Sequence, residues 1–141
     1  MFTRTLAVAA LFSLSSAAFA GAADDASAHF KAIGAGNIDK IMQDYADNAT
    51  FQWVGGPLDG AYAGTEKIKE VWSKFTKSAP FEVTASRIEE SMNDKGTTVT
   101  ANVTFKGKAA INVRYVLLYR GGKLVNEVWQ ITPKALTFSD F

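Results

Sequence analysis

The sequence contains no cysteine and only one histidine, His29, among its 141 residues. It therefore has no thiol for a disulfide or a thiolate metal site, and a single imidazole cannot build a histidine-rich site. It also lacks an excess of charge, with 15 Lys and Arg against 14 Asp and Glu. Proteins that bind nucleic acids or anionic membranes usually carry a basic surface. We therefore expect no metal site and no nucleic-acid partner, and a fold stabilised by packing alone.

Residues 1–20 have the order of a secretory signal peptide. Arg4 precedes an apolar run at 6–12, and the small-x-small pattern Ala-Phe-Ala follows at 18–20. Three serines interrupt the run, which falls short of the roughly 20 apolar residues of a spanning helix. Cleavage after Ala20 leaves a single domain, and cleavage after Ala23 is an alternative. We expect a periplasmic or secreted protein without stable membrane insertion once the signal is removed.

Apolar residues at helical spacing predict three helices in the first half of the chain. The first contains His29 and meets Gly34 and Gly36, which interrupt its pattern. The second is capped by Asn37, and its apolar stripe ends with Tyr45. The third covers residues 65–77, and Pro80 forbids its continuation. A short strand at 51–54 is expected between the second and third helices.

From Phe81 onward the apolar period changes to two. Apolar residues alternate with polar ones from Thr98 to Phe105, which is typical of a half-buried antiparallel strand. Turn residues at 93–96, 106–108 and 121–122 separate four strand-like runs. Together these patterns predict an α+β fold in which helices pack on an antiparallel meander.

The last turn allows a prediction of strand register. A two-residue loop at Gly121 and Gly122 pairs Arg120 with Lys123, and this pairing places Arg114 opposite Trp129. Arg114, Glu127 and Trp129 then share one face, which we assign to the interior. The opposite face carries Val113, Tyr115, Leu117 and Val128, an apolar set too large for solvent. We expect a homodimer through this outer face, unless the segment 135–138 folds back and covers it.

Three segments resemble the nuclear transport factor 2-like superfamily, in its polyketide-cyclase (SnoaL-like) branch. They read YADNATF at 45–51, GAYAGTEKIKEVW at 60–72 and GKLVNEVW at 122–129. The resemblance implies a cone-shaped, strongly curved antiparallel sheet that packs with about three helices around a lumen, over residues 24–132, with a C-terminal tail at 133–141. It also implies that Glu127 and Trp129 face the lumen. Trp129 stands where a catalytic aspartate often sits in the family, so that carboxylate is missing here.

Several residues are candidates for function, each with a structural alternative. Glu127 or His29 could act as an acid or base, but Glu127 could equally form an ion pair with Arg114, and His29 could be a satisfied core residue. Arg114 has the two-pronged geometry to hold a carboxylate or enolate oxygen. Aromatic residues with a polar atom could either fill the core or orient a flat ligand; they are Tyr45, Trp53, Tyr62, Trp72 and Trp129.

Three functions remain open from the sequence. The first is an exported protein that binds a small, largely apolar molecule in its lumen. The second is a cofactor-independent lyase, isomerase or cyclase that uses Glu127 or His29. The third is a structural dimer subunit with a closed lumen. We expect no cofactor, because the chain has neither a glycine-rich nucleotide motif nor a Gly-x-Ser-x-Gly nucleophile motif.

Overall fold

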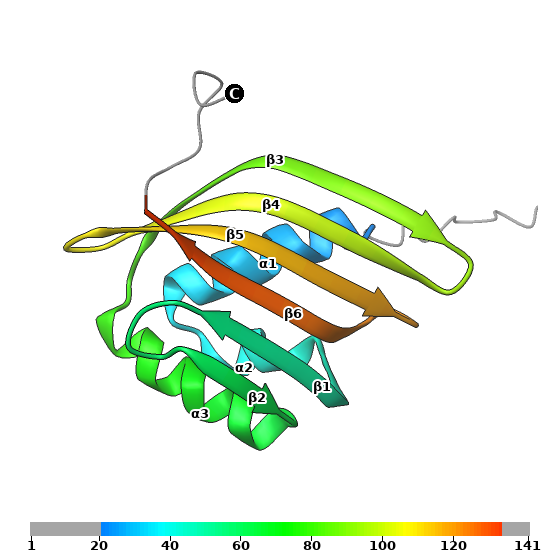
Figure 1. Cartoon of the computed structure of the whole chain (residues 1–141), viewed down its shortest axis with the longest axis horizontal. Coiled ribbons are helices and arrows are strands. Elements are labelled where there is room, and N and C mark those ends of the chain that lie inside the picture. Colours follow the sequence, from blue (N-terminus) through cyan, green and yellow to red (C-terminus); the bar gives the residue numbers. More distant parts are fainter. Residues whose placement is uncertain (1–20, 134–141) are drawn as a thin grey trace, which may run out of the picture.

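The computed structural model describes residues 21–133, and the predicted signal peptide and residues 134–141 of the predicted tail lie outside them (Figure 1). The helices are α1 (Ala22–Ala35), α2 (Ile38–Gln43) and α3 (Thr65–Phe75), the last followed by a short 3-10 turn (Thr76–Ser78). The strands are β1 (Tyr45–Val54), β2 (Gly60–Ala63), β3 (Glu82–Asn93), β4 (Gly96–Lys106), β5 (Ala110–Arg120) and β6 (Lys123–Thr132). None of the helices within 21–133 is long and apolar enough to cross a membrane.

All six strands form one curved sheet, in the order β2-β1-β6-β5-β4-β3. Neighbouring strands run antiparallel except β1 and β6, which are parallel. The three helices lie on one face of this sheet (Figure 1). The predicted α+β fold, with helices packed on a curved sheet, is therefore confirmed.

Glycines allow α1 to lie against the sheet and then end. A Cβ on Gly34 would lie 2.3 Å from Val83 Cγ2, so only glycine lets α1 approach β3 this closely. Gly36 has φ of 68°, in the left-handed region, and its N–H bonds to the carbonyls of Ala32 and Ile33. The helix therefore runs through Gly34, which the sequence pattern treated as an interruption, and ends at Ala35 with Gly36 as its C-cap.

The second helix is shorter than predicted. It ends at Gln43, and Tyr45 is the first residue of β1, which also begins before the expected strand at 51–54. Leu124 N–H donates to the Asp44 carbonyl, and Tyr45 pairs with Leu124 of β6. Because of this parallel pairing with a distant segment, Tyr45 forms part of a strand although the local periodicity favours a helix.

The predicted register is wrong, although Arg120 does pair with Lys123. Two residues of β5, Leu118 and Tyr119, pair with Asn126 and Leu124, so Val125 is the extra residue of a β-bulge. Beyond the bulge every pairing shifts by one. Tyr115 lies opposite Trp129, and Arg114 lies opposite Gln130.

A second one-residue difference affects the other side of β5. Lys106 pairs with Ala110, so the loop between β4 and β5 has three residues, whereas the predicted turn has two. A one-residue slip moves every side chain of a strand to the other face. The buried set is therefore Val113, Tyr115, Leu117 and Tyr119, and Arg114 lies on the outer face. The predicted outer apolar set is corrected accordingly, and of its members Val128 stays outside the core.

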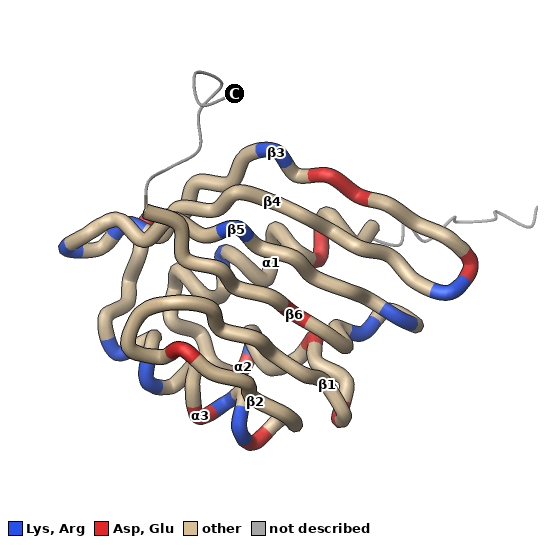
Figure 2. The backbone as a smooth tube through the Cα atoms, viewed as in Figure 1, with Lys and Arg blue, Asp and Glu red and all other residues tan. Residues whose placement is uncertain are grey.

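Charged residues of both signs are scattered over the loops, the helices and β3 (Figure 2). The interior beneath the sheet is instead dominated by aromatic rings, which contact one another from α1, α3 and strands β1, β4, β5 and β6. Two polar residues, His29 and Glu127, are buried among them with 1% and 0% of their surface exposed. These two residues lead to the candidate site.

Candidate functional site

Five buried side chains form a polar cluster at the inner end of the cone. They come from five different elements: His29 of α1, Tyr45 of β1, Trp72 of α3, Tyr115 of β5 and Glu127 of β6. We call these five residues the polar cluster. The curvature of the sheet and the helices over it bring them together from positions up to 98 residues apart.

The carboxylate of Glu127 is the centre of this cluster. His29 Nε2 lies 2.9 Å from Glu127 Oε2, and the Tyr45 hydroxyl donates to Oε1 at 2.5 Å. The Tyr115 hydroxyl also donates to Oε2. Trp72 Nε1 in turn donates to the Tyr45 oxygen at 2.8 Å. The carboxylate thus accepts three hydrogen bonds, which offset the cost of burying it.

The electrostatics of the cluster keep its tyrosines protonated. Burial raises the pKa of Tyr45 well above its usual value, and the neighbouring Glu127 carboxylate raises it further. Burial and Glu127 likewise raise the pKa of Tyr115. Both hydroxyls are therefore hydrogen-bond donors at neutral pH and cannot serve as bases there.

The outward side of the cluster approaches two groups near the surface. His29 Nδ1 has no hydrogen-bond partner among residues 21–133, and the nearest carboxylate oxygen is Asp44 Oδ2 at 3.8 Å. The Tyr119 hydroxyl is also buried without a partner in this part of the chain. Burial and the charges of Glu127 and Asp44 raise its pKa. The His29 ring therefore connects a buried carboxylate with a half-exposed one.

An aromatic layer of Trp53, Phe75, Phe105 and Trp129 covers the opposite side of the polar cluster. Trp129 stacks on Trp53 and Phe105, with ring centroids 4.7 and 4.9 Å away. Its other neighbours include Tyr115 of the cluster at 5.3 Å. Trp129 is fully buried and sits between the cluster and the mouth of the cone.

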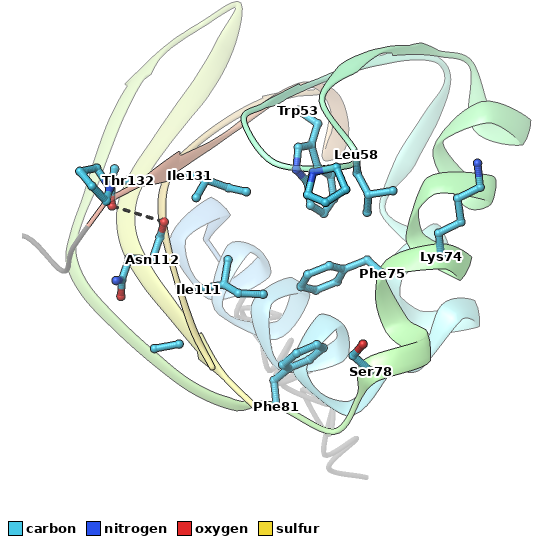
Figure 3. Close-up of a pocket in the computed structure, with 13 residues that line it drawn as sticks. Trp53, Leu58, Lys74, Phe75, Ser78, Phe81, Ile111, Asn112, Ile131 and Thr132 are labelled. Carbon is cyan, nitrogen blue, oxygen red and sulfur yellow. Dashed lines mark hydrogen bonds between the residues drawn. The ribbon is translucent and has the colours of Figure 1, made fainter. Parts of the chain in front are cut away.

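A cavity of about 450 Å³ opens beyond this layer, at the end of the sheet where β1 and β6 stop and β5 starts. Figure 3 shows Trp53 and Leu58 on one side of it and Phe75 and Phe81 facing them. We call this space the mouth cavity. Its lining residues are Trp53, Pro57, Leu58, Lys74, Phe75, Ser78, Phe81, Ala110, Ile111, Asn112, Ile131, Thr132 and Pro133.

The predicted site residues fall into three places. Glu127, His29, Tyr45 and Trp72 meet in the polar cluster, and Trp129 covers them. Trp53 belongs to both the aromatic layer and the mouth cavity. Tyr62 lies at the edge of the core, where its hydroxyl donates to the Leu58 carbonyl. Arg114 lies on the outer face, opposite Gln130, so it neither pairs with Glu127 nor shares a face with Trp129 as the predicted register required.

Sequence reasoning missed Tyr115 as a partner of Glu127. Its error in register placed Tyr115 on the outer face, although β5 has apolar residues at 113, 117 and 119 in phase with it. It also missed the mouth cavity, most of whose lining residues lie in loops or at strand ends. Among residues 21–133, no three His, Asp or Glu side chains are grouped to hold a metal ion.

The comparisons with known proteins agree with this architecture. The SnoaL-like domain family matches residues 26–130, and the chain belongs to that family. No curated protein matches the sequence significantly. Three solved structures below illustrate the likeness, which at these identities concerns the fold alone.

A nuclear transport factor 2-like protein of unknown function from Pseudomonas putida is 16% identical, with a TM-score of 0.67 over 81% of this chain and 89% of that one. A ketosteroid isomerase-like protein from Erwinia carotovora atroseptica is 17% identical, with a TM-score of 0.64 over 78% and 92%. A protein of ketosteroid isomerase-like fold from Catenulispora acidiphila, solved with trimethylamine, is 14% identical, with a TM-score of 0.60 over 79% and 87%.

Proposed function

We propose that this protein binds a small, largely apolar molecule in the mouth cavity. The observation that carries the proposal is the cavity itself, about 450 Å³ in volume and lined mainly by aromatic and aliphatic side chains. This volume lies within the range of small-molecule sites, about 300–1,000 Å³. Trp53, Phe75 and Phe81 offer flat apolar walls, on which a ring or alkyl chain gains most from burial.

The chemistry of the lining favours binding over turnover. Lys74 is the one titratable side chain among the lining residues, and its ammonium lies 3.7 Å from Glu70 on the exposed face of α3. Glu127 and His29 do not line the cavity, because Trp129 and Trp53 lie between. A ligand in the cavity therefore contacts neither the Glu127 carboxylate nor the His29 imidazole.

The test is a fluorescence titration with N-phenyl-1-naphthylamine, an apolar dye that brightens when water is excluded. We expect saturable binding, and Ile111→Asp should weaken it at least about tenfold, because it puts a carboxylate into the apolar wall. The matched control is Ile88→Asp, since Ile88 is an exposed residue of β3 that is not part of the lining. Absence of saturable binding, or equal losses in both variants, would contradict the proposal.

A second candidate is cofactor-independent acid–base catalysis by the polar cluster. The specific observation in its favour is the contact between His29 and Glu127 in a fully buried setting, an arrangement common at functional sites. Substrate could reach Glu127 only if Trp53 and Trp129 moved. Native mass spectrometry of the protein from its own cells identifies a co-purifying ligand. Incubation of that ligand with wild type and Glu127→Gln then tests for turnover.

We further propose that the protein acts after export and as a homodimer. The order of features at 1–20 supports export. The corrected outer face carries Val116, Leu118 and Val128, which are half-buried and adjacent on β5 and β6. A two-fold partner would cover them. If the dye fails to bind while the dimer forms, the structural-subunit function becomes the better one.

A further inference from the structure

The first turn of α1 lies against β3 at Glu90. Ala23 N–H donates to Glu90 Oε2 at 3.1 Å. Gly21 lies beside the same carboxylate, since a Cβ built on it would be 3.7 Å from Oε2 and 4.0 Å from Oε1. The N-cap of α1 is Gly21, which has no side chain to accept a bond from the first turn. Glu90 therefore supplies from another element the acceptor that the helix lacks.

We infer that the mature protein begins at Gly21 and that its α-ammonium group pairs with the Glu90 carboxylate. The sequence allows cleavage after either Ala20 or Ala23, but the two products differ in the structure. A chain that starts at Asp24 loses the bond from Ala23 to Glu90 and the packing of Ala22 against the core. It also loses the Gly21 carbonyl, which accepts from Asp25 N–H at 3.0 Å. A chain that starts at Gly21 keeps all three contacts.

The pair exists only after processing. In the precursor the nitrogen of Gly21 is an uncharged amide. An endopeptidase hydrolyses the Ala20–Gly21 bond with one water: Ala20 gains the hydroxyl and leaves as a carboxylate, and the Gly21 nitrogen becomes an ammonium group at neutral pH. The positive charge lies at the positive end of the helix dipole, so it needs acidic neighbours. Glu90 provides one, and Asp24 and Asp25 lie in the same first turn.

The surroundings of the first turn already favour a cation. Burial and the charges of Asp44 and Asp24 raise the pKa of Asp25, as expected where carboxylates crowd together. An ammonium group at Gly21 relieves part of this repulsion. Because Glu90 is exposed, the pair is a surface ion pair, and its effect on stability is small but measurable.

The first experiment expresses the full chain with its own leader in an exporting bacterium and measures the intact mass of the product. We expect the mass of residues 21–141. A product that begins at Asp24, or one that retains Met1, would overturn the inference at this step, whatever the outcome of the dye titration.

The second experiment is a thermodynamic double-mutant cycle on the chain that starts at Gly21. It compares four proteins, which carry either a free or an acetylated amino group and either Glu or Gln at position 90. Acetylation removes the charge, so it and Glu90→Gln should each lower the melting temperature by about 1–4 °C, and together by no more than either alone. Glu89→Gln is the matched control, because Glu89 is the adjacent exposed residue and pairs with Thr100, on the opposite face from Glu90. Acetylation and Glu90→Gln with additive effects would overturn the pairing.

Discussion

The two ends of the cone interior use similar aromatic residues but differ in what those residues surround. At the inner end, Tyr45 and Tyr115 direct their hydroxyls at the fully buried Glu127 carboxylate. At the mouth, Trp53, Phe75 and Phe81 surround an open cavity with no carboxylate in its lining. The difference teaches that the chemically richest part of the molecule is not the accessible part. Polar residues alone would point to the enclosed end, away from the mouth cavity.

Removal of the Glu127 carboxylate should cause the largest loss in the free energy of unfolding, because this carboxylate is the shared hydrogen-bond acceptor of the inner end. Glu127→Ala leaves His29, Tyr45 and Tyr115 without their acceptor and opens a cavity. We expect a loss of about 3–5 kcal/mol in the free energy of unfolding, measured by urea denaturation. Asn126→Ala, at the exposed neighbouring position, should change it by less than about 0.5 kcal/mol. A loss below about 1 kcal/mol for Glu127→Ala would mean that the cluster does not stabilise the fold.

Alkaline pH should also destabilise the inner end. The pKa values of Tyr45, Tyr115 and Tyr119 are raised in the folded protein above the usual tyrosine value of 10.0. Their contribution is therefore fully present below pH 10 and is lost as pH rises towards the folded values, because only the unfolded chain then ionises. Each such tyrosine gives a slope of about 1.4 kcal/mol per pH unit above its unfolded pKa.

Thermal unfolding between about pH 8 and pH 11 measures this loss. Tyr119→Phe provides the control, because it removes a buried hydroxyl that has no hydrogen-bond partner in the described chain. We expect this variant to lose less stability at alkaline pH than wild type. Equal sensitivity in the two proteins would argue against the buried-hydroxyl explanation.

The outer face offers a test that leaves both ends of the interior intact. Val128→Asp places a charge beside Val116 on the half-buried outer patch, so it should convert a dimer to a monomer in sedimentation velocity. Dye binding at the mouth should be unchanged. Tyr115→Asp is unsuitable for this purpose, because Tyr115 is fully buried. A wild-type protein that sediments as a monomer would contradict the proposed homodimer.

The smallest effect is expected for a substitution at Arg114, because this residue lies on the outer face and not in the interior. Arg114→Gln should change the free energy of unfolding by less than about 0.5 kcal/mol and leave dye affinity unchanged, because the side chain lies outside the cone. Urea denaturation and the dye titration measure these two quantities. A large loss of dye affinity would instead indicate that Arg114 contacts the bound ligand.

Local patterns predicted the main elements well. The third helix has buried residues at 68, 71, 72 and 75, which the spacing of three and four anticipated. The alternation in β4 likewise identified Val99 and Phe105 as core residues of a strand. These predictions succeed because each depends on residues that are close in sequence. The prediction that the second helix reaches Tyr45 was wrong, because Tyr45 pairs instead with Leu124, which lies far away in the sequence.

The site was predicted only in part, for a related reason. Glu127 and His29 were identified by their chemical type. Arg114 was considered as an ion-pair partner of Glu127, whereas the carboxylate meets His29, Tyr45 and Tyr115. Alternation gives the two faces of a strand but not which face is inside. The extra residue Val125 and the third loop residue Ala109 each reverse that choice, and neither of them is a glycine or proline that would mark the irregularity.

The sequence by itself determined the α+β class, the family and the packing-dependent character of a chain without cysteine, because composition and short-range periodicity are properties of neighbouring residues. Only the tertiary structure decided which side of β5 is buried, because its register depends on single-residue irregularities. It also decided that the polar cluster is enclosed and the mouth cavity is open, because burial is the outcome of contacts among five distant elements and cannot be read from any one of them.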